Sequence, residues 1–98
     1  MSPAADMVLP AVLTQTQAAQ VAAQLQAAIR AHSGVFRLDA SALRQFDSSA
    51  LSVLLRAARA AAEQGLPLQV SGLPERALQL AQVYGVADLI QPSPPLAA

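Results

Sequence analysis

The stretch "FDSSALSVLL", residues 46–55, decides the fold of this chain. Its acid and two hydroxyls stand directly before a run of aliphatic side chains. Asp and Ser side chains accept hydrogen bonds from the free N–H groups of a helix's first turn, so Asp47-Ser48-Ser49 predicts a helix N-terminus. Gly65 is a natural helix stop, and we therefore expect a helix from about Ser48 to Gln64.

The side chains of this helix predict an inward and an outward face. The face toward the sheet is expected to hold Leu51, Leu54, Leu55, Ala58, Ala61 and Ala62. On the side away from the core we expect a smooth strip of Ser49, Val53, Ala57 and Ala60, bordered by the solvated Ser52 and Arg56. Small side chains would let another protein approach closely. Alternatively, the alanines reflect only the high helix propensity of that residue.

Strands and helices alternate along the rest of the chain. Residues 7–13 predict a short strand that Pro10 confines to a sheet edge or bulge. Further strands are expected at 35–39 and 66–70, with helices after the capping box at 14–17 and after Pro74. We expect a polar connection at 40–47 and a last short apolar segment at 86–90. Strict alternation implies right-handed βαβ units, so we predict a small α/β sandwich with a mostly parallel sheet of about four strands.

The length and composition of the chain limit the number of domains and the kinds of partner that we expect. Ninety-eight residues, 54% of them hydrophobic, suit one domain, which we place at 7–90 between a flexible leader at 1–6 and a disordered, proline-rich tail at 91–98. Net charge is zero and the six basic residues are scattered arginines, which disfavours nucleic acid or an anionic membrane as partner. Cysteine is absent and no apolar run is long enough to cross a bilayer, so we expect a soluble cytoplasmic chain that binds proteins.

Catalytic and metal-binding arrangements are missing. The single histidine, His32, follows a helix and precedes a strand, so it should lie solvated at the opposite end of the sheet from Ser48. That separation excludes a Ser-His-Asp hydrolase. There is no lysine for phosphoaspartate chemistry, no phosphate-binding glycine motif, and too few histidines and cysteines for zinc. We expect no enzyme activity, no cofactor and no metal.

Polar residues collect where the predicted strands end. Asp39, Asp47, Ser48 and Gly72 follow strands and should meet at the carboxyl edge of the sheet, where sites usually form. Asp47-Ser48-Ser49 is foremost a helix cap, and an exposed hydroxyl there is also a good phosphoacceptor. On the third helix, Leu78 and Val83 flank the expected core stripe and widen its apolar arc, which favours a second contact surface for a partner. That stripe consists of Ala77, Leu80, Ala81 and Tyr84.

These residues resemble the STAS domain over about 7–90. The resemblance lies in a strand that ends at Leu38-Asp39, the motif Phe46-Asp47-Ser48-Ser49-Ala50-Leu51 at the start of a helix, Gly65, and a strand that leads into Ser71-Gly72-Leu73. STAS domains occur in anti-sigma-factor antagonists, in sulfate-transporter tails and in the MlaB-type subunit of the Mla phospholipid-transport ABC complex. The resemblance implies a binding module in which Ser48 matches the functional hydroxyl.

Within the family, the chain is most similar to the MlaB type, through Ala40-Ser41-Ala42-Leu43 and through residues 80–86 with Leu89. This similarity implies an accessory subunit that binds the cytoplasmic ATPase of the transporter, peripheral to the inner membrane. The implied contacts are Asp47, Ser48 and Ser49 with the surface of Ser52, Val53, Arg56, Ala57, Ala60, Leu78 and Val83.

Two departures from the family pattern bear on that expectation. The N-terminal hairpin is reduced to residues 7–13, so the sheet could be a strand short, and Ala50 stands where sigma-pathway members commonly carry glycine.

The alternative implied function is an anti-sigma-factor antagonist that binds a kinase-type anti-sigma factor and is switched by phosphorylation of Ser48. A third alternative is a homodimerising domain without a regulatory role.

Overall fold

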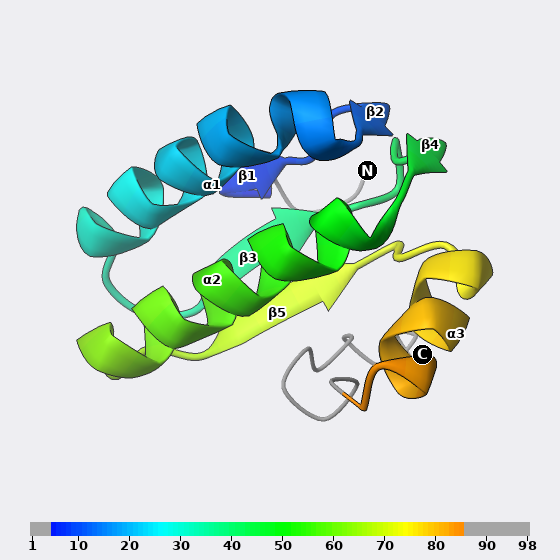
Figure 1. Cartoon of the computed structure of the whole chain (residues 1–98). Helices are drawn as coiled ribbons and strands as arrows, with labels where there is room; N and C mark the ends of the chain where they lie inside the picture. Colours follow the sequence, from blue (N-terminus) through cyan, green and yellow to red (C-terminus); the bar gives the residue numbers. More distant parts are fainter. Residues whose placement is uncertain (1–4, 86–98) are drawn as a thin grey trace.

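The computed structural model describes residues 5–85 of the chain (Figure 1). The predicted apolar segment at 86–90, the predicted tail at 91–98 and residues 1–4 of the predicted leader lie outside the described residues. The described part contains five strands and three helices. In chain order they are β1 (Met7–Val8), β2 (Val12–Leu13), α1 (Gln15–Arg30), β3 (Phe36–Asp39), β4 (Gln45–Phe46), α2 (Ser48–Gln64), β5 (Leu68–Ser71) and α3 (Glu75–Val83).

The strands form two parallel sheets. The larger has the order β1-β3-β5, and Leu38 in its central strand lies between Met7 and Val70. The smaller pairs β2 with β4. Parallel strands joined by helices confirm the predicted α/β class. The expected strand at 7–13 is divided into β1 and β2, because Pro10 has no N–H with which to continue a ladder.

Helices α1 and α2 lie side by side over one face of the larger sheet, and α3 packs beside α2 near the β5 edge (Figure 1). The two long helices run in the same direction. At their starts, the Gln15 N–H lies 3.4 Å from the Asp47 carboxylate, and at their ends the Gln64 side chain donates to the Arg30 carbonyl. This arrangement brings both helix N-termini to the carboxyl edge of the sheet, where the motif lies.

The core is a single apolar layer between the helices and the sheet. Alternation along β3 turns Phe36 and Leu38 inward and leaves Arg37 exposed. Burial of a large aliphatic or aromatic side chain stabilises a fold by about 1.5–3 kcal/mol, so a few such residues dominate this core. The largest fully buried side chains are Phe36, Leu9, Leu13, Leu25, Ile29, Leu38, Leu54, Val53 and Val70.

The predicted faces of α2 were partly wrong. Val53 is 1% exposed, Ala57 0% and Ala60 6%, so the expected outward strip is turned into the core. Leu55 and Ala58 are only half-buried and Ala62 is exposed. The reason is that α2 has two neighbours on its inner side: the sheet below it and α1 beside it, the helix with which it packs most extensively. A wider inward arc is needed to cover both, and small side chains there let two helices approach closely.

Three further expectations need correction. Residues 40–47, expected to be a polar connection, contain β4, which is too short to leave an alternating pattern. His32 is only 24% exposed rather than fully solvated, because its ring packs against Phe36 and bonds to Val35. Asp6, assigned to a loose leader, is hydrogen-bonded to β3 through its backbone and its carboxylate.

Helix boundaries follow the sequence closely. The α1 start is fixed by Gln17, whose side-chain oxygen accepts hydrogen bonds from the Thr14 N–H and hydroxyl at 2.9 Å. Helix α2 has the predicted bounds, and Gly65 ends it in the left-handed conformation with a φ of 69°. Pro74 precedes the first residue of α3 and so fixes where that helix begins.

Candidate functional site

Asp47 is the centre of the site because it joins two helix N-termini. Its backbone is extended, and its Oδ1 atom accepts a hydrogen bond from the Ser49 N–H at 2.8 Å, which makes it the N-cap of α2. Its Oδ2 atom lies 3.4 Å from the Gln15 N–H at the start of α1. The predicted cap is thus confirmed, and the same carboxylate also contacts the start of α1.

The charge of Asp47 suits this position. The N-terminus of a helix carries a partial positive charge, which favours an anion there. The hydrogen bond from the Ser49 N–H lowers the pKa of the Asp47 carboxyl below its ordinary value, against the weaker opposing effect of desolvation. The carboxylate is therefore ionised at neutral pH, and it lies next to the Ser48 hydroxyl at the surface.

Beyond the cap, three polar residues follow one another along the solvent side of α2. Ser48, Ser52 and Arg56 are spaced four residues apart and are all exposed, so they form one continuous outer edge of α2. Ser49 is half-buried beside them. Of the predicted motif and surface on α2, these four residues are available to a partner, whereas Val53, Ala57 and Ala60 are not.

The loops after β3 and β5 adjoin each other, as predicted for the carboxyl edge of a parallel sheet. Asp39 Oδ1 accepts a hydrogen bond from the Ser41 N–H at 2.8 Å, and this side chain and backbone bonding to Ser41 lowers the pKa of Asp39. Gly72 lies directly against Ser41: a Cβ atom on Gly72 would lie 2.7 Å from the Ser41 Cβ. With its φ of 70°, the position requires glycine both for conformation and for space.

One contact at the site has no clear signal in the sequence. The Arg76 guanidinium at the start of α3 lies over the Phe46 ring, 5.4 Å from its centroid. Phe46 directly precedes Asp47, so this cation–π contact ties α3 to the strand that leads into the motif. The two residues are thirty positions apart in the sequence, and only the fold brings them together.

The two predicted partner contacts on α3 differ in exposure. Val83 is 80% exposed near the helix end, and Leu78 is half-buried. Tyr84, which the sequence assigned to the core stripe, is 58% exposed and lies next to Val83. Val83 and the following Tyr84 are thus the two large apolar side chains exposed at the C-terminal end of α3.

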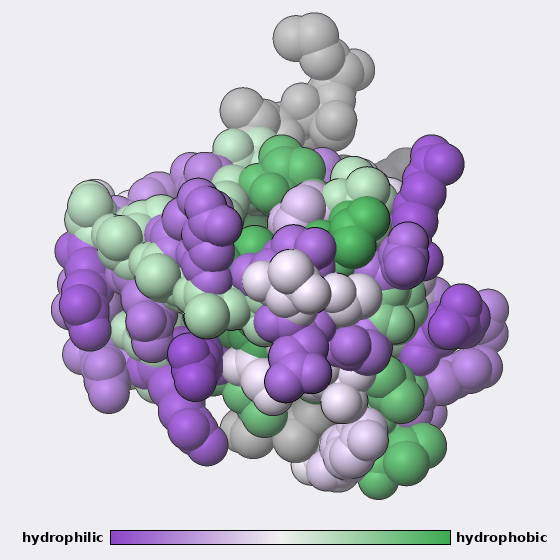
Figure 2. Space-filling view, turned by 45° about the horizontal axis from the view of Figure 1, so that its top comes forward, coloured by the Kyte–Doolittle hydropathy of each residue, from purple (hydrophilic) through white to green (hydrophobic). Residues whose placement is uncertain are grey.

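The surface around the helices is otherwise mixed in polarity. Figure 2 shows a face on which purple polar side chains are interleaved with green apolar ones, without one broad apolar area. No helix between residues 5 and 85 is long and apolar enough to cross a membrane. In that same range, histidine and acidic side chains do not gather in groups of three or more that could hold a metal ion.

His32 lies at the far end of the molecule from Ser48, as predicted. It follows the C-terminus of α1, which adjoins the C-terminus of α2 through the bond from Gln64 to Arg30. A helix of 17 residues is about 25 Å long, and that length separates the imidazole from the Ser48 hydroxyl. A Ser-His-Asp arrangement is therefore excluded by geometry.

Helices over one face of a parallel sheet, with an Asp-Ser-Ser cap at the start of the second helix, are the arrangement expected of a STAS domain. A family model described as "Mlab, STAS domain" matches residues 3–91, and the chain belongs to that family. STAS domains are generally non-enzymatic binding or regulatory modules that act through contacts with other proteins.

Solved structures support the same fold. One similar structure is that of an anti-sigma-factor antagonist (STAS) domain protein from Planctomyces limnophilus, with a TM-score of 0.71 and 20% sequence identity. The match covers 85% of this chain and 75% of the other. No protein among the curated sequences matches the chain.

Proposed function

We propose that this protein is a non-enzymatic accessory subunit that binds and supports the cytoplasmic ATPase of an Mla-type phospholipid-transport ABC transporter. The observation that carries the proposal is the match to the MlaB STAS family model over residues 3–91. In this role the protein is cytoplasmic and lies at the inner membrane only through its complex. It needs no cofactor.

The outer edge of α2 suits such a contact. Ser48, Ser52 and Arg56 are exposed, and the helix beneath them is rigidly held by its cap and by α1. A preorganised surface loses little conformational freedom on binding, which favours affinity. Val83, with the half-buried Leu78, offers an apolar contact on α3 beside α2. The buried Val53, Ala57 and Ala60 support this surface from below and do not touch the partner.

Co-expression tests the proposal. The protein should co-purify at a fixed ratio with the ATPase subunit of the Mla transporter from the same organism, and the pair should remain together in gel filtration. ATPase activity and stability of the transporter should fall when the protein is omitted. If purified protein and ATPase elute separately at micromolar concentrations, the proposed function is wrong.

The second candidate is an anti-sigma-factor antagonist that binds a kinase-type anti-sigma factor. The observation that favours it is the exposed Ser48 at a helix N-terminus, in a fold similar to a protein described as such an antagonist. A phosphate on Ser48 would add a charge of about −2 beside Asp47 and so alter what docks there. Mass spectrometry after incubation with ATP and the cognate kinase tests this function, which predicts one phosphate on Ser48 and none on Ser48→Ala.

A further inference from the structure

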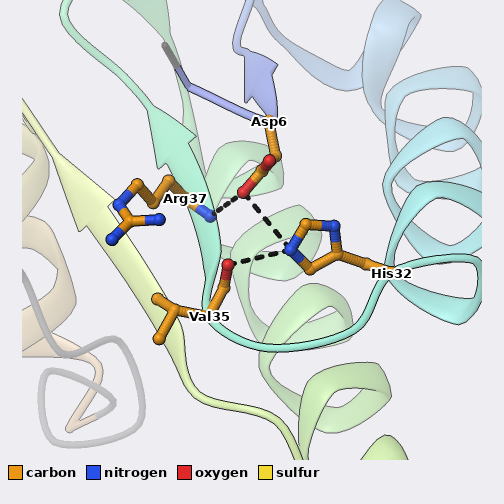
Figure 3. Close-up of polar contacts among 4 residues, drawn as sticks. All are labelled: Asp6, His32, Val35 and Arg37. Carbon is orange, nitrogen blue, oxygen red and sulfur yellow. Dashed lines mark hydrogen bonds and ion pairs between the residues drawn. The ribbon is translucent and has the colours of Figure 1, made fainter. Parts of the chain in front are cut away.

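The charges of the chain cancel in total, but they are distributed unevenly over the fold. Asp6, Asp39 and Asp47 lie outside the helices, and the carboxylate of each accepts a hydrogen bond from a backbone N–H of the chain itself. In Figure 3 the Asp6 carboxylate faces the Arg37 N–H and the His32 ring, while the Arg37 guanidinium points away from it. These three acids therefore serve the backbone and leave the arginine side chains without them.

The long helices carry mainly positive charge. Helix α1 has no charged side chain from Gln15 to Ile29, and Arg30 in its last turn is its only one. On α2 the charged side chains are Arg56, Arg59 and Glu63, and all three are exposed. The two helices together thus present three arginines and one glutamate to solvent.

Arg56 and Arg59 have no acidic partner within the described part of the chain. They are three positions apart and so lie on one face of α2, with about 5–6 Å between Cβ atoms. Between residues 5 and 85 the sole ion-pair contact joins His32 to Asp6, so Glu63, one turn beyond Arg59, does not pair with it. A guanidinium group keeps its charge in proteins and only donates hydrogen bonds. Both groups are therefore available to carboxylates of another molecule.

We propose that the outer edge of α2 recognises an acidic segment of its protein partner, whose aspartate or glutamate side chains pair with Arg56 and Arg59. This inference rests on the proposed function and adds the chemistry of the surface that the ATPase presents. A guanidinium group can donate two parallel hydrogen bonds to one carboxylate, which fixes orientation as well as charge. Ser48 and Ser52 have short side chains, so the partner lies close to the first turns of α2 and its acids meet the arginines beyond them.

A protein fits this surface better than a nucleic acid or an anionic membrane. Phosphate backbones are bound by basic patches or stripes, and lipid surfaces by clusters of about four to eight basic residues. Helix α1, which packs beside α2, adds no charge before Arg30 and does not widen the basic area. Two arginines on one helical face match a few carboxylates on one helix or loop of a partner.

Surface plasmon resonance with the purified transporter ATPase tests the proposal. Because salt screens exposed charges, the affinity of the wild type should fall at least about fivefold between about 50 and 300 mM NaCl, mainly through slower association. At the lower salt concentration, Arg56→Gln and Arg59→Gln should each weaken binding about two- to fivefold, and the double variant about five- to twentyfold. The double variant should also lose most of the salt dependence.

Arg37→Gln is the matched control. It removes the same charge from the opposite face of the larger sheet, because alternation along β3 turns Phe36 and Leu38 toward the helices and leaves Arg37 exposed on the other side. Its affinity and salt dependence should equal those of the wild type. All three arginines are exposed, so circular dichroism should show the same fold in every variant.

The possible outcomes separate this inference from the proposed function. If the wild type binds the ATPase with an affinity that salt does not change, or if the double variant binds as tightly as Arg37→Gln, the acidic contact is wrong and the proposed function stands. If the wild type does not bind at either salt concentration, both are wrong. Binding of the wild type to phosphatidylglycerol vesicles that the double variant loses would also overturn the inference, since the arginines would then serve a lipid surface.

Discussion

Small side chains occur on both the inner and the outer side of α2, so the two sides are hard to tell apart in the sequence. In the structure the inner side packs in the core and the outer side is exposed to solvent. Ser52 is exposed, and its neighbour Val53 is 1% exposed. Ala57 is fully buried, and Arg56 before it is in solvent. The small residues of the inner side admit the chain's own α1 rather than a second protein. The comparison teaches that a smooth helical strip shows where something packs closely without showing which molecule it is.

The largest expected effect comes from a charge on the inner side. Val53→Asp should lower the free energy of unfolding by at least about 3 kcal/mol, because an uncompensated carboxylate would be buried between α2 and the core. Ser52→Asp, one residue away, should change it by less than about 0.5 kcal/mol. Urea unfolding followed by circular dichroism measures both, and equal losses would contradict the assigned faces.

Added volume on the inner side should have the next largest effect. Ala57→Leu overpacks the space beside α1 and should cost about 1–3 kcal/mol of stability. Arg56→Leu places the same side chain on the outer edge and should be nearly neutral in stability. A stable Ala57→Leu variant would mean that this position faces a free surface after all.

Loss of the cap on α2 should lower the stability of the fold by less than the substitutions on the inner side. Asp47→Ala leaves the Ser49 N–H without its acceptor and removes the contact with Gln15, and Tm should fall by about 4–8 °C. Asp47→Asn keeps a capping oxygen and should recover most of the loss. Differential scanning calorimetry at neutral pH compares the three proteins. Equal melting temperatures for the wild type and Asp47→Ala would show that the cap is dispensable.

Lowering the pH should have the smallest of these effects on the stability of the fold. The pKa of Asp47 is lowered in the folded state from an ordinary value of 3.8, so its ionised form is stabilised by folding. That contribution is present above about pH 4 and disappears as the pH falls through the lowered pKa. Between pH 5 and 2 the wild type should lose slightly more stability than Asp47→Asn. An identical loss would place the acid sensitivity elsewhere, with Asp39 as the next carboxylate to replace.

Local signals in the sequence were strong enough to predict most of the fold. The Asp47 cap and Gly65 gave the bounds of α2, because an Asp side chain accepts hydrogen bonds from the free N–H groups of a first helical turn and glycine readily adopts the left-handed conformation that ends a helix. The alternation of strands and helices gave the parallel sheet. By contrast, β2 and β4 have two residues each, and a pair of residues shows no period.

The site was predicted less completely than the fold, for a physical reason. Periodicity shows that α2 has an apolar arc and does not show how many neighbours cover it, so Val53 and Ala57 were placed on the wrong side. The stacking of Arg76 on Phe46 and the joining of Asp6 to His32 depend on how distant segments meet. Contacts of this kind leave no recognisable pattern in a single sequence.

Binding by the outer edge of α2 is the central claim, and affinity for the transporter ATPase tests it most directly. Isothermal titration should compare Ser52→Arg on that edge with Gln24→Arg, a matched substitution at an exposed position of α1. Ser52→Arg should weaken binding at least about tenfold, a difference of about 1.4 kcal/mol, while Gln24→Arg binds like the wild type. Unchanged binding by Ser52→Arg, or an equal loss in Gln24→Arg, would contradict the claim.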